Sequence, residues 1–160
     1  KTPGWTIGRC LTIAGFCRER GAEALADGCN TATAAGVSHR RQRYRGWPMV
    51  GMEPAVKPAA EATSSGVVGV LETTGTLQSA RFEALLDRFA NDVRVVTQPC
   101  PALVELSETG DLVSPQIRQL LQHYVEQLLA ARCDTIILGC TPYPFRKPSL
   151  RHMLTESVTL

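Results

Sequence analysis

The stretch Gly66-Val67-Val68-Gly69-Val70-Leu71-Glu72-Thr73-Thr74-Gly75-Thr76 decides the fold class. Its first six residues form an apolar, valine-rich run that is typical of a buried parallel strand, and residues 73–76 form the turn after it. An apolar stripe with i, i+3, i+4, i+7 spacing follows and predicts an amphipathic helix, on Phe82, Leu85, Leu86 and Phe89. A strand, a turn and a helix in this order predict an α/β fold with a parallel sheet.

The same alternation runs through the rest of the chain. Further strands are predicted at 24–28, 48–52, 93–97 and 134–138, and helices at 6–19, 31–44 and from Ser114-Pro115 to Leu128. Residues 53–63 read as a proline-interrupted helix or a linker. The apolar side of the first helix is expected to hold Ile7, Leu11, Ile13 and Phe16. Asp27 is an unusual residue for a buried strand.

Two similar segments stand at the ends of predicted strands, Gly28-Cys29-Asn30-Thr31 and Gly139-Cys140-Thr141. The carboxyl ends of parallel strands are where ligands bind in open α/β sheets. The Thr73–Thr76 turn follows a third strand in the same way. We therefore expect two half-domains that each present one thiol to a shared cleft.

These residues suggest proton-transfer chemistry. A thiol acts as a base only as thiolate, and Cys29 precedes a predicted helix whose N-terminus favours that form. Exposed N–H groups there, with the Asn30 amide and the Thr31 hydroxyl, are suited to a carboxylate, and Thr73 and Thr76 add two hydroxyls. Two facing thiols can take a proton from one side of a carbon and return one from the other. The pattern favours a cofactor-independent racemase for a small anionic substrate, without phosphate or metal.

The other cysteines and the histidines are assigned structural roles. Cys10, Cys17 and Cys133 are expected to be packed apolar residues, and Cys100 a packed thiol between two prolines. The absence of a CxxC pair argues against a zinc or thioredoxin-like site, and reduced, cytosolic thiols are expected. The three histidines, His39, His123 and His152, are expected on the surface, and residues 39–43 on the solvated end of a helix.

Composition and charge indicate which classes of binding partner to expect. The 160 residues are 44% hydrophobic and 20% charged, as in a globular protein, and a formal net charge of +2 gives no reason to expect nucleic acid. No run approaches the length of a membrane span, and no signal-peptide pattern opens the chain. The first residue is Lys1 rather than Met, which fits a piece of a longer protein.

Several motifs resemble the bacterial glutamate racemases of the aspartate/glutamate racemase superfamily, over essentially the whole chain. They are the segments 29–33 (CNTAT), 50–58 (VGMEPAVKP), 70–76 (VLETTGT), 98–101 (QPCP), 138–141 (LGCT) and 143–144 (YP). The resemblance implies two similar open parallel-sheet domains that face each other across a cleft, and interconversion of L- and D-glutamate for peptidoglycan in the bacterial cytoplasm, without a cofactor. It implies acid/base roles for Cys29 and Cys140. Substrate binding is implied for Asn30, Thr31, Thr73, Thr76 and Thr141, with Glu108 a weaker match near the second thiol.

The chain departs from the family pattern at several places. The family's opening Asp-Ser-Gly and Tyr-Gly segments have no counterpart, and Pro142 stands where the family has histidine. We expect a partial first domain at 1–52 carrying Cys29, a second domain at 53–143 ending at Cys140, and the start of the return to the first domain at 144–160. The departures at Asp27, where the family has a valine-rich strand, and at Pro142 favour an alternative, a remnant that binds a dicarboxylate or a protein partner without turnover. The intact pair of cysteines favours the racemase. A racemase for aspartate or a hydantoin is a third hypothesis, and a homodimer stays open.

Overall fold

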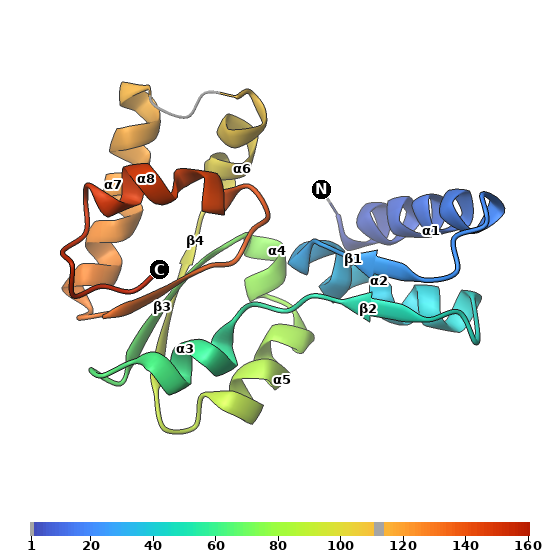
Figure 1. The fold of residues 1–160 in the computed structure, drawn as a ribbon, viewed down its shortest axis with the longest axis horizontal. Helices are drawn as coiled ribbons and strands as arrows, with labels where there is room; N and C mark the ends of the chain where they lie inside the picture. Colours follow the sequence, from blue (N-terminus) through green and yellow to red (C-terminus); the bar gives the residue numbers. More distant parts are fainter. Residues whose placement is uncertain (1, 111–113) are drawn as a thin grey trace.

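The computed structural model describes residues 2–110 and 114–160 and contains two parallel sheets (Figure 1). The smaller sheet pairs β1 (Leu25–Asp27) with β2 (Met49–Gly51). The larger sheet has the order β4 (Arg94–Pro99), β3 (Val67–Glu72), β5 (Thr135–Leu138). Strand pairing is parallel in both sheets, which confirms the predicted α/β class with open parallel sheets.

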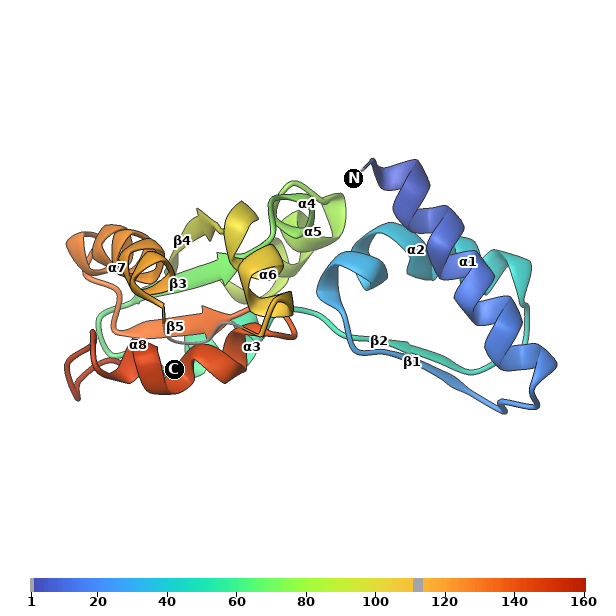
Figure 2. The same ribbon diagram turned by 90° about the horizontal axis from the view of Figure 1, so that it is seen from above.

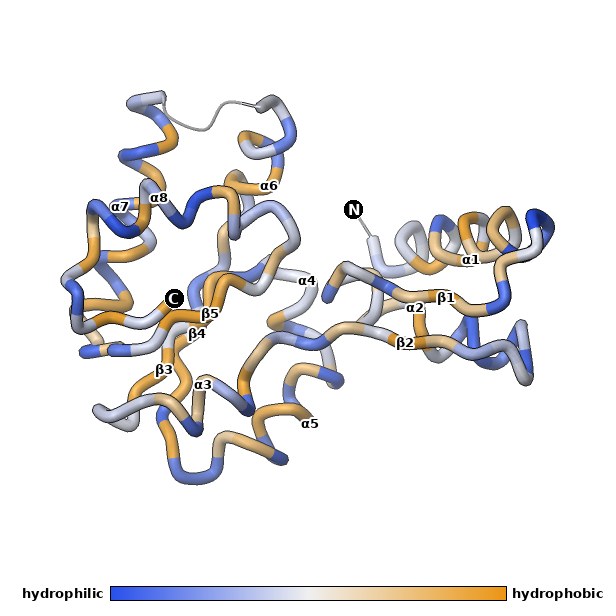
Figure 3. The backbone as a smooth tube through the Cα atoms, viewed as in Figure 1, coloured by the Kyte–Doolittle hydropathy of each residue, from blue (hydrophilic) through white to orange (hydrophobic). Residues whose placement is uncertain are grey.

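The central strand of the larger sheet is β3, and every one of its residues after Val67 is buried. Helices α3 (Val56–Ala62) and α5 (Ala80–Phe89) supply the cluster that holds Val68 and Val70. Helices α6 (Pro101–Glu108) and α7 (Pro115–Ala130) supply the cluster that holds Leu71. Alternate side chains of a strand point to opposite faces, so the two clusters cover the two faces of the sheet. Figure 3 shows the three strands as the hydrophobic centre of this unit.

The C-terminal segment packs on the same unit. It forms a short 3₁₀ helix, η1 (Tyr143–Arg146), and then α8 (Lys147–Arg151). Leu150, Leu154 and Val158 join the cluster on the α6–α7 face. The last residues lie parallel to β5, where Ile136 N–H donates to Thr159 O at 2.8 Å.

The smaller unit has both of its helices on one side of its sheet (Figure 2). Helices α1 (Pro3–Glu19) and α2 (Asn30–Arg43) pack together through small residues. A Cβ at Gly36 would lie 2.9 Å from the Cys10 side chain, so glycine permits this close approach. The predicted apolar stripe of the first helix is wrong for two residues, because Ile13 and Phe16 are each 53% exposed.

Asp27 is explained by a buried ion pair. Its carboxylate accepts a hydrogen bond from Arg40 Nη2, and the two side chains are 14% and 2% exposed. A buried carboxylate is tolerated when a cation pairs with it. The prediction that residues 39–43 form a solvated helix end is therefore wrong for Arg40, whereas His39, Arg41 and Arg43 are exposed.

Some elements differ from the sequence-based expectation. Residues 73–76 are not an open turn: Thr73 is the N-cap of a short helix, α4 (Thr74–Leu77). Helices α6, η1 and α8 were not predicted. His123 and His152 are exposed, as predicted. Within residues 2–110 and 114–160, no helix combines the length and the apolar character needed to cross a membrane.

Candidate active site

The two Gly-Cys segments contact each other, although more than a hundred residues separate them. Asn30 Nδ2 donates to Gly139 O at 2.5 Å, and Thr141 Oγ1 donates to Gly28 O at 2.7 Å. The side chain after each cysteine thus binds the carbonyl of the glycine before the other cysteine. We call this pair of hydrogen bonds the reciprocal clasp. It joins the carboxyl end of β1 to the carboxyl end of β5.

A cluster of three hydroxyls lies on the same edge. Thr31 Oγ1, at the start of α2, is 2.8 Å from Thr73 Oγ1 and 3.0 Å from Thr76 Oγ1. The Thr73 and Thr76 hydroxyls are 3.1 Å apart. Thr73 also accepts from the Thr76 N–H as the cap of α4. The structure therefore brings Thr31, Thr73 and Thr76 together.

Glu72 is a residue of this edge that sequence reasoning passed over. Its side chain is fully buried at the end of β3. Oε1 accepts from the Thr73 N–H at 2.8 Å, and Oε2 accepts from Asn30 Nδ2 at 3.0 Å. Burial raises the pKa of Glu72, and hydrogen bonds from Thr73, Asn30 and Thr76 oppose that rise. An acidic residue at the end of an apolar strand, beside the threonine motif, was the available signal.

The thiol of Cys140 is held in its protonated form at neutral pH. Burial raises its pKa to about 12, and the nearby charges of Glu72 and Cys29 contribute to the rise. Cys29 lies at the N-cap of α2, whereas Cys140 follows β5.

The other cysteines lie away from the clasp or inside the core. All six thiols are free. Cys10, Cys100 and Cys133 are buried, as expected, and Cys17 is half-buried on α1. Burial raises the pKa of Cys100 to about 12. The Tyr143 hydroxyl donates to Cys100 O at 3.2 Å, which ties η1 to the start of α6. Glu108, the weaker match, is exposed near the end of α6.

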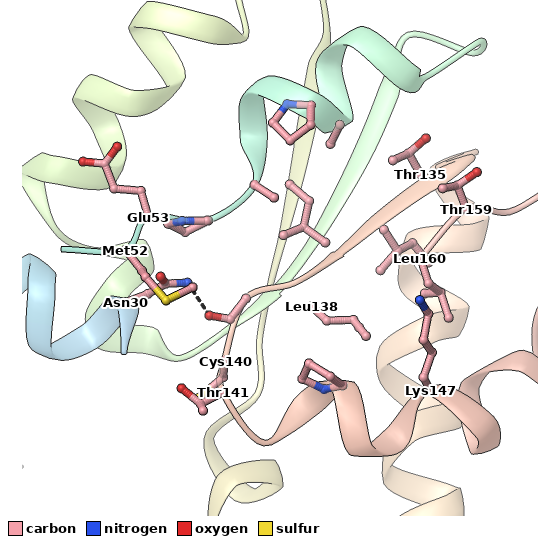
Figure 4. Close-up of a pocket in the computed structure, with 18 of the residues that line it drawn as sticks. Asn30, Met52, Glu53, Thr135, Leu138, Cys140, Thr141, Lys147, Thr159 and Leu160 are labelled. Atoms are coloured by element: carbon pink, nitrogen blue, oxygen red, sulfur yellow. Dashed lines mark hydrogen bonds between the residues drawn. The ribbon is translucent and has the colours of Figure 1, made fainter. Parts of the chain in front are cut away.

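A pocket of about 820 Å³ opens beside the clasp (Figure 4). Asn30, Cys140 and Thr141 line one end, and Met52 and Glu53 line the connection between β2 and α3. From there the pocket follows β5 and α3 toward Thr159 and Leu160. Its walls are mainly apolar, with Lys147 at the α8 side. Among the described residues, no group of three or more His, Cys, Asp or Glu side chains is placed to hold a metal ion.

Comparison with known proteins gives one consistent result. The family model for Asp/Glu/hydantoin racemases matches residues 6–159. A glutamate racemase of Pseudomonas syringae pv. tomato is 79% identical over the whole chain, and one of Pseudomonas putida strain KT2440 is 66% identical. The crystal structure of Escherichia coli glutamate racemase, in complex with L-glutamate and an activator, superposes with a TM-score of 0.87 at 31% identity.

The matched relatives are longer than this chain. All 160 residues align, yet they span 58% of the P. syringae protein and 60% of the P. putida protein. They cover 61% of the E. coli chain. The chain thus spans about 60% of the length of its relatives.

Proposed function

Because this chain belongs to the Asp/Glu/hydantoin racemase family, we propose that its two Gly-Cys segments are the catalytic pair of a racemase that interconverts L- and D-glutamate. The reciprocal clasp is the observation that carries the proposal. It joins the two segments that carry Cys29 and Cys140, which follow strands of two different sheets. The identity to glutamate racemases supports glutamate as the substrate.

The proposed reaction is a two-thiol proton transfer. The Cys29 thiolate takes the α-proton of one enantiomer, so the C–H bond breaks and its electron pair stays on the α-carbon as a carbanion. The Cys140 thiol then gives its proton to the opposite face, and the roles exchange in the reverse direction. The raised pKa of Cys140 keeps the proton on its sulfur at neutral pH, so this thiol begins as the acid. Each positioned acid or base of this kind contributes about 10²–10⁴-fold in rate.

Substrate binding is assigned to the polar side chains around the thiols. Thr31, Thr73 and Thr76 offer three adjacent hydroxyls, and Asn30 and Thr141 flank the cysteines. In the structure these groups hydrogen-bond to one another and to the glycine carbonyls. Binding of glutamate therefore exchanges internal hydrogen bonds for bonds to its carboxylate and ammonium groups.

The cellular setting follows from the same assignment. We place the enzyme in the bacterial cytoplasm, where it supplies D-glutamate for peptidoglycan. The domain boundaries proposed are 1–52, 53–143 and 144–160, with the site in a cleft between two similar domains. A homodimer is supported by the apolar face of α1, where Trp5, Ile13 and Phe16 are each at least half exposed.

The deciding experiment measures α-proton exchange and racemisation by the purified protein. Incubation of L-glutamate in deuterated water should give deuterated D-glutamate, detected by chiral chromatography and mass spectrometry. Cys29→Ala and Cys140→Ala should each abolish racemisation, because each thiol serves one face of the substrate. Cys17→Ala, a half-buried thiol on α1, is the matched control and should keep full activity.

The alternative function is binding without turnover, and Pro142 is the observation that favours it. Proline has no side-chain group to donate or accept a proton beside Cys140. Binding of L-glutamate without exchange of its α-proton, in wild type and in a Pro142→His variant alike, would support the alternative and contradict the racemase proposal.

A further inference from the structure

We propose that Glu72 is an internal carboxylate that occupies the donors of a carboxylate-binding site, and that it competes there with the carboxylate of a bound substrate. The inference rests on the proposed function, since it concerns the site assigned to glutamate. It adds a residue that limits the affinity of that site for anions.

The donors around Glu72 are those assigned to substrate. Asn30 Nδ2 and the Thr73 N–H donate to its two oxygens at 3.0 Å and 2.8 Å. The hydroxyls of Thr73 and Thr76 also lower its pKa by hydrogen bonding. These partners are neutral and come from α2 and from the start of α4. A set of neutral N–H and O–H donors that converge on one carboxylate is a carboxylate-binding site.

The hydrogen bonds of Asn30 show why Glu72 leaves no free donor there for a substrate carboxylate. Its Nδ2 group carries two hydrogens, and these go to Glu72 Oε2 and to Gly139 O. The remaining polar atom of Asn30, Oδ1, is an acceptor. Oδ1 cannot donate to a carboxylate, so the donors serve a substrate carboxylate only when Glu72 releases them.

Within residues 2–110 and 114–160, the hydrogen bonds to the Glu72 carboxyl group come from neutral donors rather than from a cation. The titratable groups that face it are thiols and a phenol: Cys140 after β5, Cys100 at the start of α6, and Tyr143 of η1. Their pKa values are all raised by burial, and the charge of Glu72 raises them further. They are therefore neutral at neutral pH and supply no positive charge beside the Glu72 carboxyl group.

Chemical rescue tests the proposal without any turnover. Glu72→Ala removes the carboxylate and leaves its donors around a small cavity, which free formate can fill. Sodium formate should raise the Tm of Glu72→Ala in a saturating manner, relative to sodium chloride at the same ionic strength. Wild type and Glu72→Gln should show no such rise, because their own side chains fill the place.

The matched control is Gln98→Ala, which shortens a buried polar side chain on the neighbouring strand. Gln98 Nε2 donates to Pro99 O, so its removal frees no convergent donors, and formate should not change its Tm. Glu72→Ser serves in place of the alanine variant where the latter does not fold. A Glu72→Ala or Glu72→Ser protein that is folded and gains no more from formate than Gln98→Ala would overturn the proposal.

A second measurement separates this inference from the proposed function. Calorimetric titration should show that Glu72→Ala binds L-glutamate roughly tenfold more tightly than wild type does. Formate rescue without glutamate binding in any variant supports the carboxylate site and counts against the glutamate assignment. Glutamate binding that is equal in wild type and in Glu72→Ala counts against competition by Glu72.

Discussion

Asp27→Asn should destabilise the smaller unit by about 3 kcal/mol. The Arg40 side chain is 2% exposed and its partner Asp27 is 14% exposed, so loss of the carboxylate leaves a guanidinium buried without a counter-charge. Breaking a buried ion pair in this way costs about 3–5 kcal/mol. We take the lower end because Asp27 is partly solvated and asparagine can still accept a hydrogen bond. That cost is about a 150-fold change in the folding equilibrium, a large part of the 5–15 kcal/mol that stabilises a typical domain.

Urea denaturation measures this cost. Both tryptophans, Trp5 and Trp47, lie in the smaller unit, so their fluorescence reports its unfolding, while circular dichroism follows the whole chain. Arg41→Met is the control: Arg41 is exposed, and its loss should change the free energy of unfolding by less than about 0.5 kcal/mol. Joint replacement of Asp27 by Leu and Arg40 by Met should recover most of the stability. An Asp27→Asn protein as stable as wild type would refute the reasoning.

Three further outcomes are expected. Burial raises the pKa of Asp134, but hydrogen bonds from Thr63, Ser65 and Ser64 outweigh that effect and lower the pKa to about 2. The ionised carboxylate therefore stabilises the fold above pH 3.8, and this contribution is lost as the pH falls through 2. Asp134→Asn should therefore cost about 1–2 kcal/mol at pH 7 by urea denaturation, and nothing below pH 2. Gly139→Ala should lower the Tm, because its Cβ would lie 2.3 Å from Glu72 Oε2 and 3.0 Å from Leu71 O, an overpacking cost of about 1–3 kcal/mol. Glu72→Ala should relieve the part of this cost that comes from its side chain, and equal Tm values for Gly139→Ala and wild type would contradict this contact. Alkylation of Cys140 by iodoacetamide, followed by mass spectrometry, should be slow at pH 7 and rise about tenfold per pH unit toward its pKa of about 12, and a rate that is flat above pH 8 would contradict the raised pKa.

The larger sheet could be predicted from the sequence because each of its strands is marked by its own residues. The run of Val67 to Leu71 has the composition of a strand buried on both faces, and β3 is that strand. The position of the Gly-Cys segments could be predicted for a related reason. Parallel strands end on a common edge, so residues after β1, β3 and β5 meet there.

The rest depends on contacts between distant residues. In α1 the small residues Cys10 and Ala14 are buried while Ile13 and Phe16 are not, because Gly36 lets α2 approach the small face. The burial of Arg40 depends on the carboxylate of Asp27 in another element, and the basic residues around Arg40 in the sequence do not indicate this partner. The role of Glu72 likewise requires Asn30 to arrive from α2, 42 positions away in the sequence.

The reciprocal clasp also sets an order in time. Its two hydrogen bonds join residues 109 and 113 positions apart, so neither can form until Gly139 and Thr141 have been synthesised. At about 5–20 residues per second, Cys29 is synthesised on the order of 5–20 s before Cys140. During that interval β1 and α2 can already be folded, while the segment that carries Cys140 does not yet exist to contact the segment of Cys29. The site thus forms after its separate strands and helices, and refolding from denaturant should restore strand and helix signals before it restores the protected state of the two cysteines.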